Sequence, residues 1–151
     1  MKKVLLLVIS GFLYLGNTAQ AQSNQNLAGL TIEFGNGSTL VGPAVKHFFN
    51  ENSAAQAELL FGGGGTFLAA FYQYHQKIQN AAGLNWYLGA GPAVGFGNGS
   101  TDFYIRPTAG LDYKVKDTPL NLSFDWRPTF YVGSDSEFTA ARFGLGFRFA
   151  F

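Results

Sequence analysis

The last nine residues, 143–151, constrain the fold of this chain most strongly, because large apolar residues and small or charged ones alternate there without exception. Side chains alternate between the two faces of a β-strand, so this stretch predicts a strand with one wholly apolar face. That face carries Phe143, Leu145, Phe147, Phe149 and Phe151. Such a face suits the closing strand of a barrel that stands in lipid.

The composition agrees with a protein made of short strands. Charged residues make up 13% of the chain, against about 25% in an average soluble domain. Aromatic residues reach 17%, and there are 20 glycines but no cysteine. These values favour strands joined by tight turns over a helical bundle or a disordered chain. A formal charge of +1 provides no basic field for nucleic acid, so we expect no nucleic-acid partner.

The N-terminus has the pattern of an export signal. Two lysines precede an apolar run over residues 4–15, and Ala19-Gln20-Ala21 is a small-x-small cleavage site. We expect a signal peptide at residues 1–21, Sec-dependent export, and a mature domain at residues 22–151. The alternative, a transmembrane anchor, needs about 20 apolar residues, and this run is shorter.

Seven turn signals divide the mature chain into eight predicted strands. The signals are clusters of Gly, Asn, Asp, Ser and Pro or polar stretches. They lie at residues 35–38, 50–53, 62–65, 76–81, 97–100, 116–119 and 133–136. Their spacing leaves about ten residues for each strand, which is the length that crosses a bilayer at a tilt. The predicted fold is an all-β, eight-stranded, antiparallel up-and-down transmembrane barrel.

The charged residues within the strands all fall on the face that also carries glycine. They are Glu33, Lys46, Glu58, Arg106, Asp112, Lys114, Asp125, Arg127, Arg142 and Arg148. A charge that faces lipid near the midplane costs about 2 to 4 kcal/mol, so the uncharged face is predicted to meet lipid. The alternative is a soluble barrel with its apolar face inward, but the interior of eight strands is too narrow for so many large side chains. In the fourth strand, residues 66–75, both faces are apolar and no orientation is assigned.

At this point the chain resembles the small outer-membrane β-barrel proteins of the OmpX type and the transmembrane domain of OmpA. The resemblance covers residues 22–151, and its most specific part is residues 146–151. This segment is similar to the C-terminal signal that the barrel-assembly machinery reads, with Gly146, Phe149 and Phe151 at its positions. The resemblance implies an outer-membrane location, the lipid bilayer as surroundings, and the assembly machinery as a partner during biogenesis.

The charged residues that could form a functional site are predicted inside the barrel, in its lumen. We expect Lys46 and Glu58 to face each other across a hairpin centred near residue 52 and to form an ion pair. Three arginines, Arg106, Arg127 and Arg142, fall at similar heights on strands six to eight. The acids expected beside them are Glu33, Asp112 and Asp125. Two interpretations are open: an anion site or selectivity ring, and a network that neutralises its own charges. We favour the network, because unpaired buried charges are costly.

Catalytic and metal sites have little support in the sequence. The two histidines, His47 and His75, both lie near turns predicted on the periplasmic side, and each is interpreted as a side chain at the membrane interface. Two distant histidines without cysteine make a poor metal ligand set, and we expect no cofactor. Matching Arg-Pro-Thr triplets at residues 106–108 and 127–129 predict a local break in strand pairing, because proline lacks the N–H donor.

Taken together, these patterns predict an integral outer-membrane barrel with a packed polar lumen and a structural or envelope-associated role without catalysis. The nine lumen residues of this prediction are Glu33, Lys46, Glu58, Arg106, Asp112, Asp125, Arg127, Arg142 and Arg148. An alternative is passage or binding of a small or amphipathic molecule through an arginine-lined lumen. A third possibility is an enzyme at the rim that acts on envelope lipids.

Overall fold

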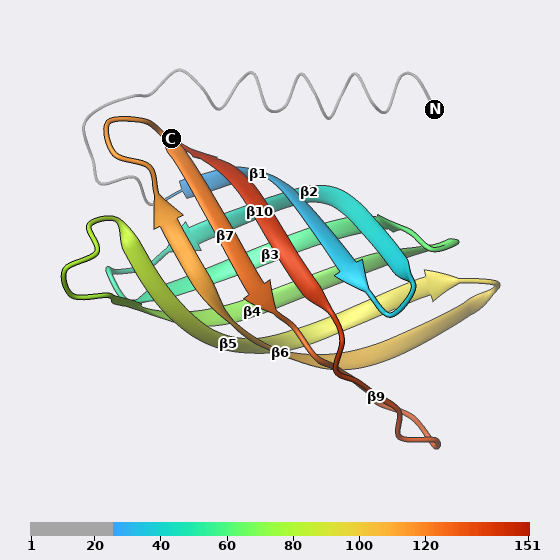
Figure 1. Ribbon diagram of the computed structural model, residues 1–151. Coiled ribbons are helices and arrows are strands. Elements are labelled where there is room, and N and C mark those ends of the chain that lie inside the picture. The colour runs from blue at the N-terminus through green and yellow to red at the C-terminus, as the bar shows by residue number, and fades with distance from the viewer. Residues whose placement is uncertain (1–25) are drawn as a thin grey trace, which may run out of the picture.

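The computed structural model describes residues 26–151, which form a closed antiparallel barrel (Figure 1). Its strands are β1 (Asn26–Gly35), β2 (Ser38–Phe48), β3 (Ser53–Gly62), β4 (Gly65–Lys77), β5 (Leu84–Gly97), β6 (Ser100–Lys114), β7 (Leu120–Trp126), β8 (Thr129–Tyr131), β9 (Phe138–Thr139) and β10 (Phe143–Ala150). The seventh wall strand is divided into β7 and β8, and the eighth into β9 and β10. The predicted eight-stranded fold is therefore confirmed, while the predicted signal peptide, residues 1–21, lies outside the described residues.

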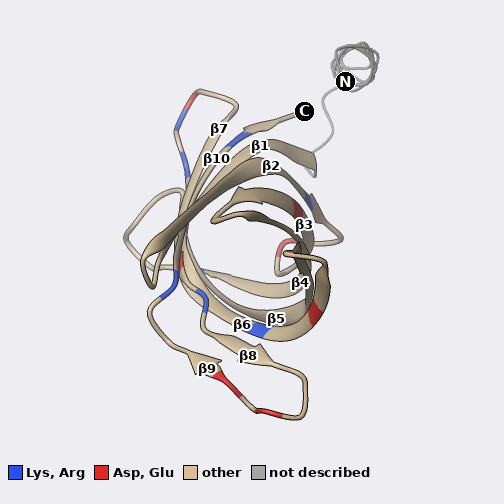
Figure 2. Ribbon diagram, turned by 90° about the vertical axis from the view of Figure 1, so that its right-hand side faces the viewer, with Lys and Arg blue, Asp and Glu red and all other residues tan. Residues whose placement is uncertain are grey.

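Closure comes from pairing of the first and last wall strands. Along β1 and β10 the register runs from Leu27 opposite Ala150 to Phe34 opposite Phe143. Every other wall strand pairs with its sequence neighbours, and β5 pairs with β6. Seen from one end, the strands form a continuous ring around the lumen (Figure 2). Within residues 26–151, no helix is long and apolar enough to cross a bilayer.

Two identical hexapeptides, residues 34–39 and 96–101, build matching hairpin turns. The central Asn36-Gly37 and Asn98-Gly99 pairs have positive φ, 49° and 76° in the first turn and 49° and 75° in the second. Positive φ at both central positions gives a turn whose twist matches the flanking strands, and Asn-Gly is the pair that adopts it most readily. We call the rim that carries these turns the Asn-Gly end, and the opposite rim, where β1 begins and β10 finishes, the terminal end.

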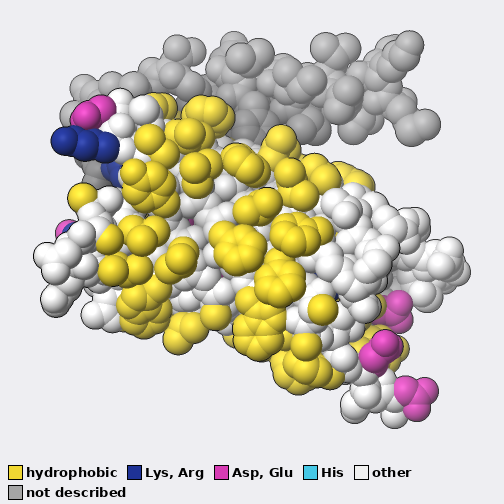
Figure 3. All heavy atoms as spheres, in the orientation of Figure 1, with side chains coloured by type: hydrophobic (Ala, Val, Ile, Leu, Met, Phe, Trp, Pro, Cys, Tyr) yellow, Lys and Arg dark blue, Asp and Glu magenta, His cyan; other side chains and the backbone are white. Residues whose placement is uncertain are grey.

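The side chains divide between the wall and the lumen as the alternation predicts. Outward-facing Leu30, Ile105 and Phe147 are 52%, 53% and 44% exposed, whereas inward-facing Thr31, Arg106 and Arg148 are at most 2% exposed. A space-filling view shows hydrophobic side chains over the barrel wall and charged ones near its ends (Figure 3). The barrel thus has an apolar exterior and a polar interior, the reverse of a soluble protein.

The fourth strand, which the sequence left unassigned, also alternates. Tyr72 and Tyr74 face outward with 58% and 46% exposure, whereas Phe71, Gln73 and His75 face the lumen and are nearly fully buried. Of the turns, the fourth lies slightly later than predicted, because β4 continues to Lys77 and the chain turns over residues 78–83. Asn80 and Gly83 supply the positive φ values that this turn needs.

The predicted break at the Arg-Pro-Thr triplets is confirmed. β7 ends at Trp126 and β8 begins at Thr129, so Arg127 and Pro128 lie between the two strands. β6 pairs with β7 from Ala109 onward and with β8 only at Tyr104 and Ile105. Beyond the break, β8 and β9 form a short hairpin that projects from the barrel at the Asn-Gly end (Figure 2).

Candidate functional site in the lumen

Arg127 lies at the centre of the lumen and joins carboxylates from three wall strands. Its guanidinium pairs with Asp125 on β7 at 2.5 Å, with Glu58 on β3 at 2.7 Å and with Glu33 on β1 at 3.4 Å. The arginine is 1% exposed, and its charge stands 5.6 Å from the centre of the Phe71 ring. These charge-assisted bonds cross the lumen and link opposite walls of the barrel.

Glycine on the last wall strand makes room for this arginine. A Cβ atom added to Gly144 would lie 2.5 Å from Nη2 and Cζ of Arg127. Gly146 has the same relation to Arg148, whose guanidinium would overlap an added Cβ atom. Arg148 donates to Ser123 Oγ at 2.8 Å and lies 3.9 Å from Glu58. On the inward face of β10, Gly144 and Gly146 therefore leave the space that the guanidinium groups of Arg127 and Arg148 occupy.

Towards the Asn-Gly end, Glu33 is shared by two further arginines. It accepts from Arg106 at 2.6 Å and pairs with Arg142 at 2.7 Å. Arg142 also donates to the Gly35 carbonyl oxygen at 3.1 Å and to Ser38 Oγ at 2.7 Å. The three arginines predicted at similar heights do come together, and their acids are Glu33, Asp125 and, unexpectedly, Glu58.

Two expectations about the partners are wrong. Lys46 does not face Glu58: the register of β2 and β3 sets Lys46 opposite Gln56, and Ala44 opposite Glu58. Lys46 instead pairs across the lumen with Asp112, at 3.1 Å. Asp112 consequently lies with Lys46 and Asn121, which donates to it at 2.6 Å, and not with the three arginines.

The turn between β2 and β3 explains the error. Asn50 Oδ1 accepts hydrogen bonds from the backbone N–H groups of Asn52 and Ser53, both at 2.9 Å, and the Phe49 N–H donates to the Ser53 carbonyl oxygen. This side-chain-capped turn centres the hairpin one residue earlier than predicted. A shift of one residue in the turn moves every cross-strand partner by two, which is what separates Lys46 from Glu58.

Sequence reasoning assigned no orientation to two lumen residues, Gln73 and His75, and it left two inward-facing residues, Gln56 and Tyr87, out of the predicted charge network. The Tyr87 hydroxyl donates to Asp125 at 2.5 Å, and the His75 ring stacks on the Tyr87 ring with centroids 4.8 Å apart. His75 was expected at the membrane interface, but it is 2% exposed and faces the lumen. The period of two that places Gln73 inward also places His75 inward, so this alternation was the signal that could have found it.

His47 lies outside the lumen, where its Nδ1 is 2.8 Å from Asn26 Oδ1. It is exposed at the terminal end, so the two histidines are on opposite sides of the wall. Within residues 26–151, no group of three or more His, Cys, Asp or Glu side chains has the arrangement of a metal site.

Comparison with known proteins identifies the architecture. No family model and no curated protein matches the chain. Among solved structures, it is similar to a de novo designed transmembrane β-barrel, with a TM-score of 0.60, 12% identity, 87% of this chain and all of that chain covered. It is also similar to the N-terminal β-barrel domain of Pseudomonas aeruginosa OprF, with a TM-score of 0.59, 18% identity and coverage of 85% and 100%. The chain has the fold of a transmembrane β-barrel.

In this transmembrane barrel, all nine residues of the predicted charge network are buried and face the lumen. They comprise five cations (Lys46, Arg106, Arg127, Arg142 and Arg148) and four carboxylates (Glu33, Glu58, Asp112 and Asp125). Lys114, also predicted on this face, is exposed near the terminal end. The ion pairs of these side chains join strands across the lumen. The arrangement also leaves one positive charge in excess, in the half towards the Asn-Gly end.

Proposed function

We propose that this chain is an integral outer-membrane β-barrel with a closed lumen and a structural, envelope-associated role without catalysis. The observation that carries the proposal is the pairing of Arg127 with Asp125, Glu58 and Glu33, which links three strands across the lumen at 2.5, 2.7 and 3.4 Å. A strongly paired guanidinium at the centre leaves no continuous polar path for a solute. The barrel would then act as a structural component of the membrane, and contacts with other molecules would be made at its two ends.

The lipid bilayer is the surrounding that the exterior fits. Outward-facing positions carry large apolar side chains such as Leu30, Leu88 and Phe124, which are 52%, 54% and 46% exposed. A soluble monomer seldom shows apolar area on this scale, whereas a membrane barrel requires it. Export by the signal peptide at residues 1–21 would deliver the chain to the outer membrane, with the Asn-Gly end facing outward and the terminal end facing the periplasm.

Conductance tests the closed lumen. After refolding into a planar bilayer, the mature chain is expected to show no discrete single-channel steps, because the Arg127 contacts occlude the lumen. A heat-dependent shift in gel mobility of the same sample would establish that a barrel has formed before silence is interpreted. Steady, reproducible steps would reject the closed lumen and favour passage of a small solute along the arginines.

Assembly is proposed to depend on the C-terminal signal Gly146, Phe149 and Phe151, read by the barrel-assembly machinery. Replacing Phe151 with alanine should lower the amount of heat-modifiable barrel in cells by about tenfold, while refolding from urea into detergent stays unchanged. The ring is 54% exposed, so its loss should affect recognition more than stability. A matched control is Phe138→Ala, another half-exposed phenylalanine at the opposite end. Equal losses in both variants would contradict a recognition role.

Passage or binding of a small molecule remains the second candidate. Passage along the whole lumen is disfavoured by the same contacts that close it, but binding at the Asn-Gly end is compatible with them. A rim enzyme has less support, because His75 is buried in the lumen and His47 pairs with Asn26 on the outside. Neither histidine forms the nucleophile and base pair that acyl transfer uses. Unchanged masses of envelope lipids on overproduction would agree with this proposal.

A further inference from the structure

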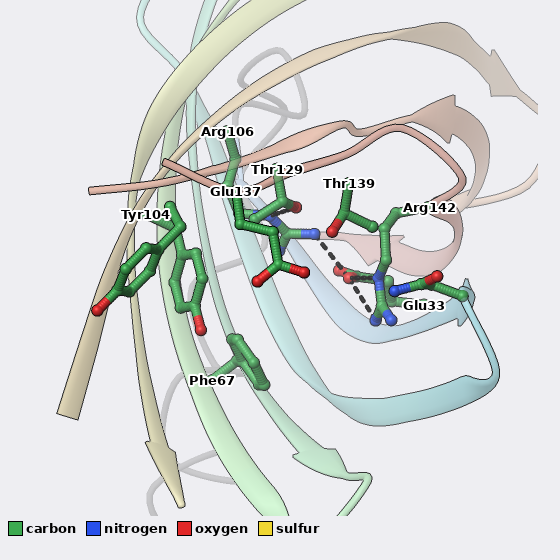
Figure 4. Close-up of a pocket in the computed structure, with 10 residues that line it drawn as sticks. Glu33, Phe67, Tyr104, Arg106, Thr129, Glu137, Thr139 and Arg142 are labelled. Carbon is green, nitrogen blue, oxygen red and sulfur yellow. Dashed lines mark hydrogen bonds and ion pairs between the residues drawn. The ribbon is translucent and has the colours of Figure 1, made fainter. Parts of the chain in front are cut away.

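A cavity of about 210 Å³ opens at the Asn-Gly end of the barrel (Figure 4). Its lining comes from distant parts of the chain and includes Glu33, Phe67, Tyr104, Arg106, Tyr131 and Arg142. We call this space the outer cavity. Each molecule in liquid water takes up about 30 Å³, so this volume corresponds to about seven water molecules. The cavity therefore suits a molecule with a single ring or a smaller one.

The base of the outer cavity is a pair of arginines on one carboxylate. Arg106 and Arg142 both pair with Glu33, at 2.6 and 2.7 Å. Arg106 also donates to Thr129 Oγ1 at 3.1 Å, but its buried Nη1 has no hydrogen-bond partner within residues 26–151. An unsatisfied guanidinium N–H is costly in a buried place, and the lumen carries one cation in excess of its carboxylates. Both facts favour an additional anion here.

The opposite wall of the cavity is aromatic. The Tyr104 ring centre lies 5.8 Å from that of Phe67 and 5.7 Å from that of Tyr131. In Figure 4 the labelled rings of Tyr104 and Phe67 stand on the side away from Arg142 and Glu33. The cavity is therefore amphipathic, with guanidinium groups on one side and a surface for a flat apolar body on the other.

One carboxylate is already held close to this base by the chain itself. Glu137 precedes β9, and in Figure 4 its carboxylate points into the cavity between the aromatic rings and the arginines. The residue is exposed, and in the described part of the chain it forms no ion pair. Its backbone is held by a hydrogen bond from the Tyr131 N–H, at 2.9 Å, so the side chain alone is free to move aside. Glu137 thus acts as a tethered competitor for an anion.

We propose that the outer cavity binds a small carboxylate with a flat apolar body, such as a one-ring aromatic acid. The carboxylate takes hydrogen bonds from Arg106, and the ring packs on Tyr104, Tyr131 and Phe67. Glu137 swings outward when the ligand enters. This binding function goes beyond the structural role proposed above, and it needs no passage through the closed lumen.

The test is calorimetric titration of the refolded barrel in detergent at low salt, with benzoate, acetate and benzylammonium as probes. Benzoate is expected to bind at one saturable site, acetate at least about tenfold more weakly because it lacks the ring, and benzylammonium not at all. Glu137→Gln should strengthen benzoate binding about two- to fivefold, the size of one exposed charge interaction. Asp135→Asn removes the same charge from the same hairpin without touching the cavity, and should leave the affinity unchanged.

Tyr131→Ala should weaken benzoate binding about fivefold or more while leaving acetate binding unchanged, since it removes one ring of the wall. Heat-dependent gel mobility would show that each variant is folded. The proposal is overturned if benzoate does not bind at millimolar concentration, or if Glu137→Gln weakens the binding. It is also overturned if benzylammonium binds and loses affinity in Glu137→Gln, which would make the cavity a cation site. A single-channel recording in the presence of benzoate distinguishes binding from passage. Benzoate binding without conductance steps would support the outer cavity and leave the closed lumen intact.

Discussion

Replacing Arg127 with alanine is expected to lower the free energy of unfolding by about 3 to 5 kcal/mol, the cost of breaking a buried charge network on one side. The substitution leaves Asp125 and Glu58 buried without the cation that pairs with both of them. Among residues 26–151, only Tyr87 would still donate to Asp125, and only Arg148, at 3.9 Å, would remain near Glu58 as a cation. Unfolding of the barrel in lipid vesicles by guanidinium chloride measures the loss in free energy of unfolding.

The exposed ion pair of Lys77 and Glu51 provides the matched control. Its atoms are 3.0 Å apart, as close as many pairs in the lumen, but the side chains are 77% and 81% exposed. Lys77→Ala should therefore change stability by less than about 1 kcal/mol. The double variant Arg127→Met with Glu58→Gln should recover part of the lost stability. Residue 58 is then uncharged, so one buried carboxylate fewer is left without its cation. A loss of less than about 1 kcal/mol for Arg127→Ala would contradict the network as the support of the lumen.

Lys46→Met is expected to destabilise the barrel by a similar amount, about 3 to 5 kcal/mol. Lys46 is 1% exposed, and Asp112, its partner at 3.1 Å, is 2% exposed. Without the lysine, the hydrogen bond from Asn121 Nδ2 is the one that Asp112 keeps within the described part of the chain. The same vesicle titration, run on single and double variants, gives the coupling energy between the two positions.

Two double-mutant cycles separate the observed partner from the one that the sequence suggested. Lys46→Met with Asp112→Asn should show a coupling of about 1 to 3 kcal/mol, as expected for residues in direct contact. Lys46→Met with Glu58→Gln should couple by less than about 0.5 kcal/mol, because the β2 and β3 register sets Gln56, not Glu58, opposite Lys46. The reverse order of the two couplings would reject the observed register.

The glycines of the last wall strand show how far sequence reasoning reaches. The alternation of residues 143–151 placed Gly144 and Gly146 on the inward face, and the structure agrees. Their purpose became clear only from the fold, since each leaves space for a guanidinium, that of Arg127 or Arg148. Arg127 reaches Gly144 from the neighbouring wall strand, at the break between β7 and β8, whereas the guanidinium of Arg148 lies over Gly146 on its own strand. The alternation of residue types predicts neither contact.

The fourth strand shows a different limit. Its inward set runs from Phe67 through Ala69 and Phe71 to Gln73 and His75, so apolar residues face the lumen near the Asn-Gly end and polar ones near the terminal end. An alternation of hydrophobicity marks a strand only when its two faces differ. Here they do not differ over the first half, and the orientation of this strand was fixed by its pairing with β3 and β5.

The sequence alone determined the number of wall strands, the apolar exterior and the burial of the charged residues, because each depends on a local property: a period of two, or a turn such as Asn36-Gly37. The tertiary structure alone decided which charges pair. A one-residue difference in the turn after Phe49 separates Lys46 from Glu58, and Lys46 pairs with Asp112 instead. Glu33 pairs with three arginines that lie far along the chain. Pairing across a lumen depends on register and stagger accumulated around the closed barrel, and only the assembled ring fixes those.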